Sequence, residues 1–109
     1  MVTVDEFQRD VYLSARRSPI CDVPHVVRSR GRSVKLRIDL HIGGFVEAYF
    51  NEDTGTTAFA WIENEKRRLG ADDTGGWHFH PQDEPERHVP LDGPLSIAEF
   101  LNWIEPAIG

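Results

Sequence analysis

Residues 33–42 alternate strictly between apolar and polar side chains, and this pattern constrains the fold more than any other in the chain. Successive side chains of a strand point to opposite faces of a sheet, so the pattern predicts a half-buried strand. The apolar set is Val34, Leu36, Ile38, Leu40 and Ile42, and the polar set is Lys35, Arg37, Asp39 and His41. A strand of this kind belongs to a sheet covered on one face only, which is typical of antiparallel sheets.

Further short strands are predicted on both sides of this segment. They lie at residues 23–30, 45–50, 56–62 and 66–71. Turn signals separate them: Gly31, Gly43-Gly44, residues 51–55 and residues 63–65. Short strands joined by short turns predict an antiparallel meander.

A helix is predicted at each end of the chain. Thr3 and Glu6 have the spacing of a capping box, and apolar residues then recur at helical spacing until Ser18-Pro19, so a helix is expected over residues 4–17. Ser96 and Glu99 repeat the capping pattern before a second helix from Ser96 to Glu105. Its apolar stripe is Ile97, Phe100, Leu101 and Ile104, which we interpret as core packing.

These elements predict an α+β fold in a single domain spanning residues 1–109. We expect an N-terminal helix, an antiparallel meander of four to six strands, a His/Pro-rich loop and a C-terminal amphipathic helix, with both helices on one face. The lone cysteine, Cys21, allows no internal disulfide, which fits a reducing compartment. No apolar run has the length of a signal peptide or a membrane span, so a cytoplasmic protein that does not enter membranes is expected.

Charge is unevenly distributed along the chain. Residues 1–40 carry eight basic and five acidic side chains, whereas residues 41–109 carry four basic and thirteen acidic ones. The simplest interpretation is a solvated basic edge, because the net charge of the whole chain is −6. A polarised molecule can nevertheless dock RNA on one face or pair with a partner of opposite charge.

Residues 72–95 differ from the rest of the chain. They hold four of the seven prolines, three glycines and three of the five histidines. A loop of this length is uncommon in a compact domain and is usually functional or disordered. Within it, residues 77–80 are expected to add one short strand.

The histidines of this segment suggest a metal site. If residues 77–80 are extended, His78 and His80 point to the same side and can chelate one metal ion. His88 or Asp83 would supply a third ligand after the proline-rich bend. Three protein ligands with one open position describe a catalytic zinc site.

Metal-free chemistry is the alternative. His78, His80 or His88 would act as general acid or base, with Asp72 orienting an imidazole and Arg87 stabilising a phosphate. This set of groups suits RNA cleavage, in which the 2′-hydroxyl is the nucleophile. A structural explanation also stands: the histidines would cap backbone groups of the loop.

From Leu36 onward, the order of features resembles the TumE-like protein family, described as the toxin half of a toxin–antitoxin pair with a helix-turn-helix antitoxin. The likeness rests on an aspartate turn at Asp72-Asp73, the His/Pro segment Trp77-His78-Phe79-His80-Pro81, the later His88 and the closing helix. Two features depart from the family: Phe79 splits its adjacent His-His pair, and its histidine-lysine-histidine run is reduced to Arg87-His88. The resemblance implies a toxin role more than a defined reaction.

A shorter resemblance involves the stretch from Gly76 to Pro81, which looks like the His-x-His-Pro core of JAMM-type zinc peptidases. That family also has a serine and an aspartate at set distances downstream, whereas Ser96 lies too far away and is followed by Ala98-Glu99. The resemblance implies zinc more than it implies a peptidase.

Three functional hypotheses follow from the sequence. The first is a TumE-like toxin that acts on RNA through the His/Asp/Arg cluster, with a helix-turn-helix antitoxin as partner. The second is a non-catalytic interaction module that pairs through an edge strand with a partner protein or in a homodimer. The third is a zinc-dependent hydrolase that uses His78 and His80.

Overall fold

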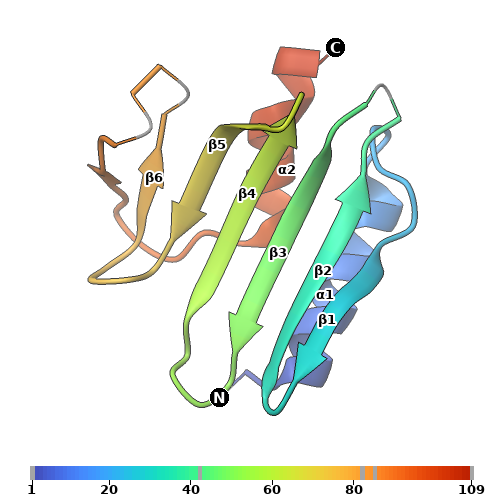
Figure 1. Cartoon of the computed structure of the whole chain (residues 1–109), viewed down its shortest axis with the longest axis vertical. Helices are drawn as coiled ribbons and strands as arrows, with labels where there is room; N and C mark the ends of the chain where they lie inside the picture. The colour runs from blue at the N-terminus through green and yellow to red at the C-terminus, as the bar shows by residue number, and fades with distance from the viewer. Residues whose placement is uncertain (1, 42, 82, 85, 109) are drawn as a thin grey trace.

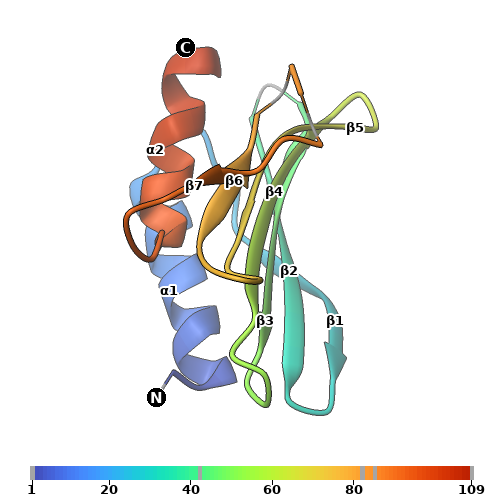
Figure 2. The same ribbon diagram turned by 90° about the vertical axis from the view of Figure 1, so that its left-hand side faces the viewer.

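A computed structural model describes residues 2–41, 43–81, 83–84 and 86–108, with side chains up to residue 106. The chain forms an antiparallel sheet with two helices, α1 (Val4–Arg17) and α2 (Ile97–Ile108). Figure 1 shows the strands following one another across the sheet, and Figure 2 shows both helices on one face. The predicted α+β class and the placement of both helices are therefore confirmed.

The sheet has seven strands in the order β1 to β7, each paired with its neighbour in sequence. They are β1 (His25–Arg30), β2 (Ser33–Asp39), β3 (Phe45–Asn51), β4 (Thr57–Glu63), β5 (Lys66–Asp72), β6 (His78–His80) and β7 (Val89–Pro90). The prediction of four to six strands was too low because β7 has only two residues, one of them proline. Proline lacks the N–H of a ladder donor and gives no strand signal, although an edge strand tolerates it.

The alternation in residues 33–42 became strand β2, which lies between β1 and β3. Val34, Leu36 and Ile38 are buried against the helices, while Lys35 and Arg37 lie on the opposite face. Leu40 is also buried and forms an isolated bridge with Cys21. Ile42, the last member of the predicted apolar set, lies outside the described residues.

The core fills the space between the sheet and the helices. Phe7 of α1 stacks on Phe50 with ring centroids 5.1 Å apart, and Phe59 of β4 lies 5.5 Å from Phe100 of α2. At the C-terminal end of α1, the Ser18 hydroxyl donates a 3.0 Å hydrogen bond to Glu105 of α2. These contacts hold the two helices over the same face of the sheet and leave the other face open.

Both predicted helix starts are capped. The Ser96 hydroxyl accepts from the Glu99 N–H, and Glu99 Oε1 accepts from the Ser96 N–H, both at 3.1 Å, which completes a capping box. At α1, the Thr3 hydroxyl accepts from the Glu6 N–H at 3.1 Å, but the Glu6 carboxylate binds the Thr3 hydroxyl rather than its backbone N–H. The first cap is therefore only half of the predicted box.

The segment from residue 72 to residue 95 is more ordered than the predicted loop, since it contains β6 and β7. A tight turn leads into β6: Gly75 and Gly76 have φ values of +71° and +109°, and Asp72 Oδ1 accepts a 3.0 Å hydrogen bond from the Thr74 N–H. Trp77 then stacks on Phe59 at 6.1 Å. In the described part of the chain, neither helix has the length and apolar character needed to cross a membrane.

The packing of β2 makes a matched prediction about stability. Leu36 is fully buried, whereas Leu13 on α1 is 40% exposed. We expect Leu36→Ala to lower the free energy of unfolding by about 2–5 kcal/mol, because it removes transfer energy and leaves a cavity. Leu13→Ala should change it by about 0.5 kcal/mol or less. Urea unfolding followed by tryptophan fluorescence measures both, and equal losses would contradict the core assignment.

Candidate metal centre

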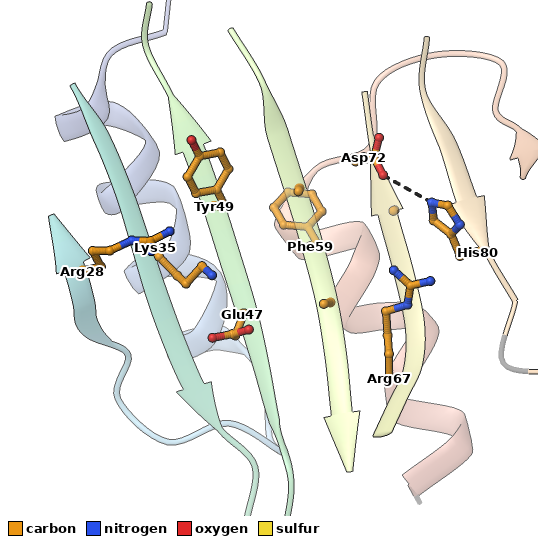
Figure 3. Close-up of a pocket in the computed structure, with 11 residues that line it drawn as sticks. Arg28, Lys35, Glu47, Tyr49, Phe59, Arg67, Asp72 and His80 are labelled. Atoms are coloured by element: carbon orange, nitrogen blue, oxygen red, sulfur yellow. Dashed lines mark hydrogen bonds and ion pairs between the residues drawn. The ribbon is translucent and has the colours of Figure 1, made fainter. Parts of the chain in front are cut away.

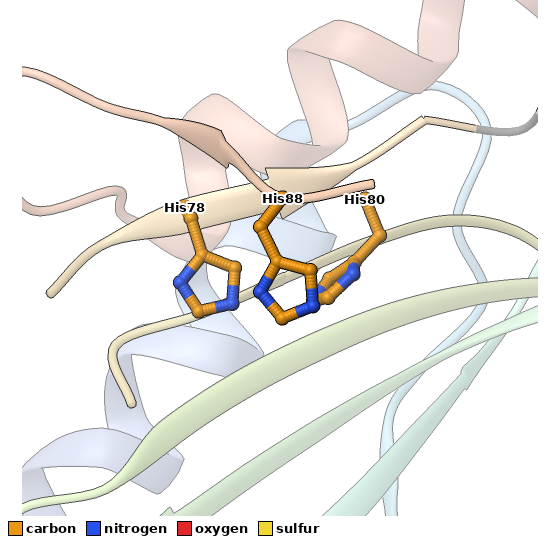
Figure 4. A group of neighbouring side chains, drawn as sticks. All are labelled: His78, His80 and His88. Carbon is orange, nitrogen blue, oxygen red and sulfur yellow. The ribbon is translucent and has the colours of Figure 1, made fainter. Parts of the chain in front are cut away.

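The pairing of β5 with β6 brings the candidate ligands together on the open face. Asp72 lies opposite His78 and Gly70 opposite His80, so both histidines share the face of the Asp72 carboxylate. His88 comes from the segment just before β7, which returns antiparallel beside β6. Figure 4 shows the three imidazoles grouped on one side of these strands.

The three imidazoles are close enough to serve one metal ion. One ring nitrogen from each of His78, His80 and His88 lies within 4.8 Å of the others. The His78 and His88 rings are stacked with centroids 4.7 Å apart, and the His80 ring meets the other two edge-on at 4.9 and 4.4 Å. Nitrogens about 2.1 Å from a tetrahedral zinc lie about 3.4 Å apart, so the three imidazoles would move closer together on sharing an ion.

The Asp72 carboxylate joins this group. Its Oδ1 lies 3.3 Å from His78 Nε2, and its Oδ2 lies 3.3 Å from His80 Nε2. Charge-assisted hydrogen bonds are usually shorter, about 2.7–2.9 Å. A separation of about 3.3–3.4 Å is also that of two ligand atoms sharing a tetrahedral zinc. The spacing of Asp72 from His78 and His80 suits either hydrogen bonding or shared metal ligation, and the group of potential metal ligands itself consists of His78, His80 and His88.

The orientation of His78 supports the same interpretation. Its Nδ1 lies 2.8 Å from the Gly76 carbonyl oxygen, which can only accept, so Nδ1 carries the proton. His78 Nε2 then faces Asp72 Oδ1 at 3.3 Å, where a proton or a metal ion would lie between them. Metal-bound histidines typically donate their other N–H to a carbonyl or a carboxylate, as His78 does here.

Burial strengthens the electrostatics of the cluster. The side chains of His80, His78 and Asp72 are 9%, 12% and 25% exposed. Burial alone would raise the pKa of Asp72, but hydrogen bonds from the Thr74 N–H and His80, together with the charge of His78, outweigh it and leave that pKa below its ordinary value. The carboxylate is therefore held ionised beside the imidazoles.

The cluster is open on one side. His88 is exposed, and with His78 it lines a surface depression of about 390 Å³ that also includes Gly76, Trp77, Pro90 and Leu91. His80 and Asp72 line a second depression of about 350 Å³ on the sheet face. An ion held here would be reached from both sides, which leaves a position for water or substrate.

Two residues predicted for the site lie elsewhere. Asp83 is exposed and does not belong to the group of potential metal ligands found among the described residues. Arg87 is also exposed, and its guanidinium lies 3.8 Å from Glu84. Neither residue lines the two depressions that border the cluster.

Arg67 lines the same sheet-face depression as His80 and Asp72, a position that its sequence context does not indicate. Figure 3 shows its side chain pointing along β5 toward them. A register shift between Trp61 and Ile62 pairs Ile62 with Arg67 and turns Arg67 to the open face. Strand alternation cannot reveal such a bulge, so the sequence held no clear signal for this residue.

The remaining histidines and the cysteine are separate from the cluster. His41 is exposed and pairs with Asp22 at 3.0 Å, and His25 is exposed on β1. Burial raises the pKa of the Cys21 thiol, more than its hydrogen bond with Ser18 lowers it. Cys21 is therefore a buried packing residue.

Comparison with protein-family models, with curated proteins and with solved structures gave no match. The assignment of a function to this fold therefore rests on the geometry of the cluster.

The cluster predicts one metal-binding site per chain. Titration of metal-free protein with Co²⁺ should give visible absorption of a four-coordinate site that saturates at one equivalent. His78→Ala removes a proposed ligand. Replacing a residue that only contacts a ligand typically weakens metal binding about 10–100-fold, and His78→Ala should weaken Co²⁺ binding more than that. The control His41→Ala, which removes an exposed histidine outside the cluster, should bind as the wild type does. Equal binding by both variants would contradict the site.

Proposed function

We propose that this protein is a metal-dependent hydrolase of the zinc type, with Asp72, His78, His80 and His88 holding the ion. The observation that carries the proposal is the spacing of Asp72 from His78 and His80, 3.3 Å to each, with His88 on the solvent side. Imidazole and carboxylate ligands suit zinc, although copper, iron and nickel also accept imidazole.

The protein's own groups would do three things at such a centre. The Gly76 carbonyl fixes the orientation of His78, and Asp72 supplies negative charge that strengthens binding of a cation. Exposed His88 leaves an approach for substrate, and the sheet-face depression lined by His80 and Asp72 offers a second one. When bound, zinc lowers the pKa of a coordinated water to about 7, which supplies a nucleophile near neutral pH.

Hydrolysis of chromogenic esters tests the proposal. We expect zinc-loaded protein to cleave bis(p-nitrophenyl) phosphate or p-nitrophenyl acetate, to lose this activity with a chelator and to regain it on adding zinc. His80→Ala should lower kcat/KM by at least about 100-fold, since it removes a ligand. The matched control His25→Ala should retain full activity. Activity that resists both the chelator and His80→Ala would contradict the proposal.

Metal-free acid–base chemistry on RNA is the second candidate. It is supported by the contact between His80 Nε2 and Asp72 Oδ2, because a carboxylate that fixes one ring nitrogen orients an imidazole for proton transfer. The two candidates differ in one measurable way. RNA cleavage by acid–base chemistry continues in a chelator, whereas cleavage at a metal centre stops.

The TumE-like toxin role stays a prediction, and RNA cleavage would be the activity behind it. It predicts that expression of the protein slows growth and that His80→Ala and His88→Ala relieve the effect, with His41→Ala as the control that remains toxic. Growth curves after induction, with protein levels matched by immunoblot, measure this. Unchanged growth with the wild type would count against the role. A helix-turn-helix antitoxin, a homodimer and a cytoplasmic location likewise remain predictions.

A further inference from the structure

The open face of the sheet carries a depression of about 350 Å³ beside the candidate metal centre. Figure 3 shows it running across the sheet from Arg28 and Lys35, past Tyr49, to Arg67, Asp72 and His80. The helices lie behind this face, so the depression is open to solvent. We call it the sheet groove.

Small residues form the floor of the sheet groove. Ala58 lies between Tyr49 and Asp72 in one cross-strand row, and in the next row Ala60 and Gly70 lie between Glu47 and His80. Alanine and glycine are poor strand formers, so sheet stability does not favour them at these positions. A Cβ on Gly70 would also lie 3.1 Å from Arg67 Cδ, so the glycine makes room for the arginine side chain.

Two cations stand directly opposite each other at the far end of the sheet groove. Arg28 of β1 pairs with Lys35 of β2, and both line the groove. Like charges in directly opposite positions destabilise an antiparallel pair. Among the residues that the structure describes, no carboxylate forms an ion pair with either side chain. Glu47, the carboxylate on the floor, instead lies 3.8 Å from Arg37. An anion bound between Arg28 and Lys35 would relieve their repulsion.

The length of the sheet groove limits which kind of anion can reach both of its ends. Three strand spacings separate Lys35 on β2 from Asp72 on β5, which corresponds to about 14 Å. A single phosphate cannot occupy both ends at once, whereas a chain of phosphodiesters can. The aromatic ring of Tyr49 lies between the two ends, where a base can stack on it.

We propose that the sheet groove binds the phosphodiester backbone of a single-stranded nucleic acid. One phosphate lies between Arg28 and Lys35, a base stacks near Tyr49, and a phosphate further along the strand reaches the cluster of Asp72, His78 and His80. The last part rests on the proposed hydrolase function, while binding in the groove requires no metal.

Fluorescence anisotropy in a chelator tests groove binding separately from the metal centre. The probes are fluorescein-labelled oligouridylate and oligothymidylate, which distinguish RNA from DNA. Arg28→Gln/Lys35→Gln should weaken binding about tenfold or more and should reduce the slope of log K against log salt by roughly 0.7, because one phosphate contact is lost. Tyr49→Leu should weaken binding about 5–100-fold through lost stacking.

Arg9→Gln/Arg16→Gln provides the matched control, since it removes the same charge from two exposed positions on α1 behind the sheet. This variant should bind within about twofold of the wild type. Urea unfolding separates a binding role from a structural one: Arg28→Gln/Lys35→Gln should be at least as stable as the wild type, because it removes a like-charge pair.

Failure of this inference is distinguishable from failure of the hydrolase proposal. If the wild type binds neither oligonucleotide, or if both double variants weaken binding equally, the sheet groove is not the binding site, whatever the metal content. If Co²⁺ does not bind but oligonucleotide affinity depends on Arg28 and Lys35, the groove inference stands and the metal proposal falls.

Discussion

The register of β5 against β6 is the constraint on which the candidate site depends. It sets Asp72 opposite His78 and Gly70 opposite His80. Phe79, between the two histidines, points to the other face and packs against Trp103 of α2 at 5.6 Å. A slip of one residue would bury the imidazoles under the helices and expose Phe79. The apolar contact of Phe79 therefore keeps His78 and His80 on the open face.

The same division between faces organises the whole sheet. One face is apolar and covered by α1 and α2, and the other carries the charged side chains, the small floor residues and the histidine cluster. Arg28 and Lys35 lie far from Asp72 and His80 in the sequence. The meander brings them to the two ends of one groove.

The sequence predicted those parts of the structure that depend on local patterns. Alternation in β2, the capping residues and the turn glycines each express a preference within a few residues, and these elements formed where expected. Features set by distant pairing escaped prediction. Strand β7 depends on β6 for its hydrogen bonds, and the bulge beside Trp61 that turns Arg67 to the open face is invisible to periodicity. That His78 and His80 share a side was predictable from strand alternation, whereas the place of Asp72 beside them depends on the pairing of β5 with β6. Arg87 pairs with Glu84 rather than with the cluster.

The most direct test of the central claim is a crystal structure of the protein grown with zinc, with anomalous differences measured on both sides of the zinc absorption edge. The account predicts one strong peak per chain, within about 2.0–2.2 Å of nitrogen or oxygen atoms from Asp72, His78, His80 and His88. A structure with these four side chains ordered and no peak between them, or with zinc bound only at exposed sites such as His25 or His41, would contradict it.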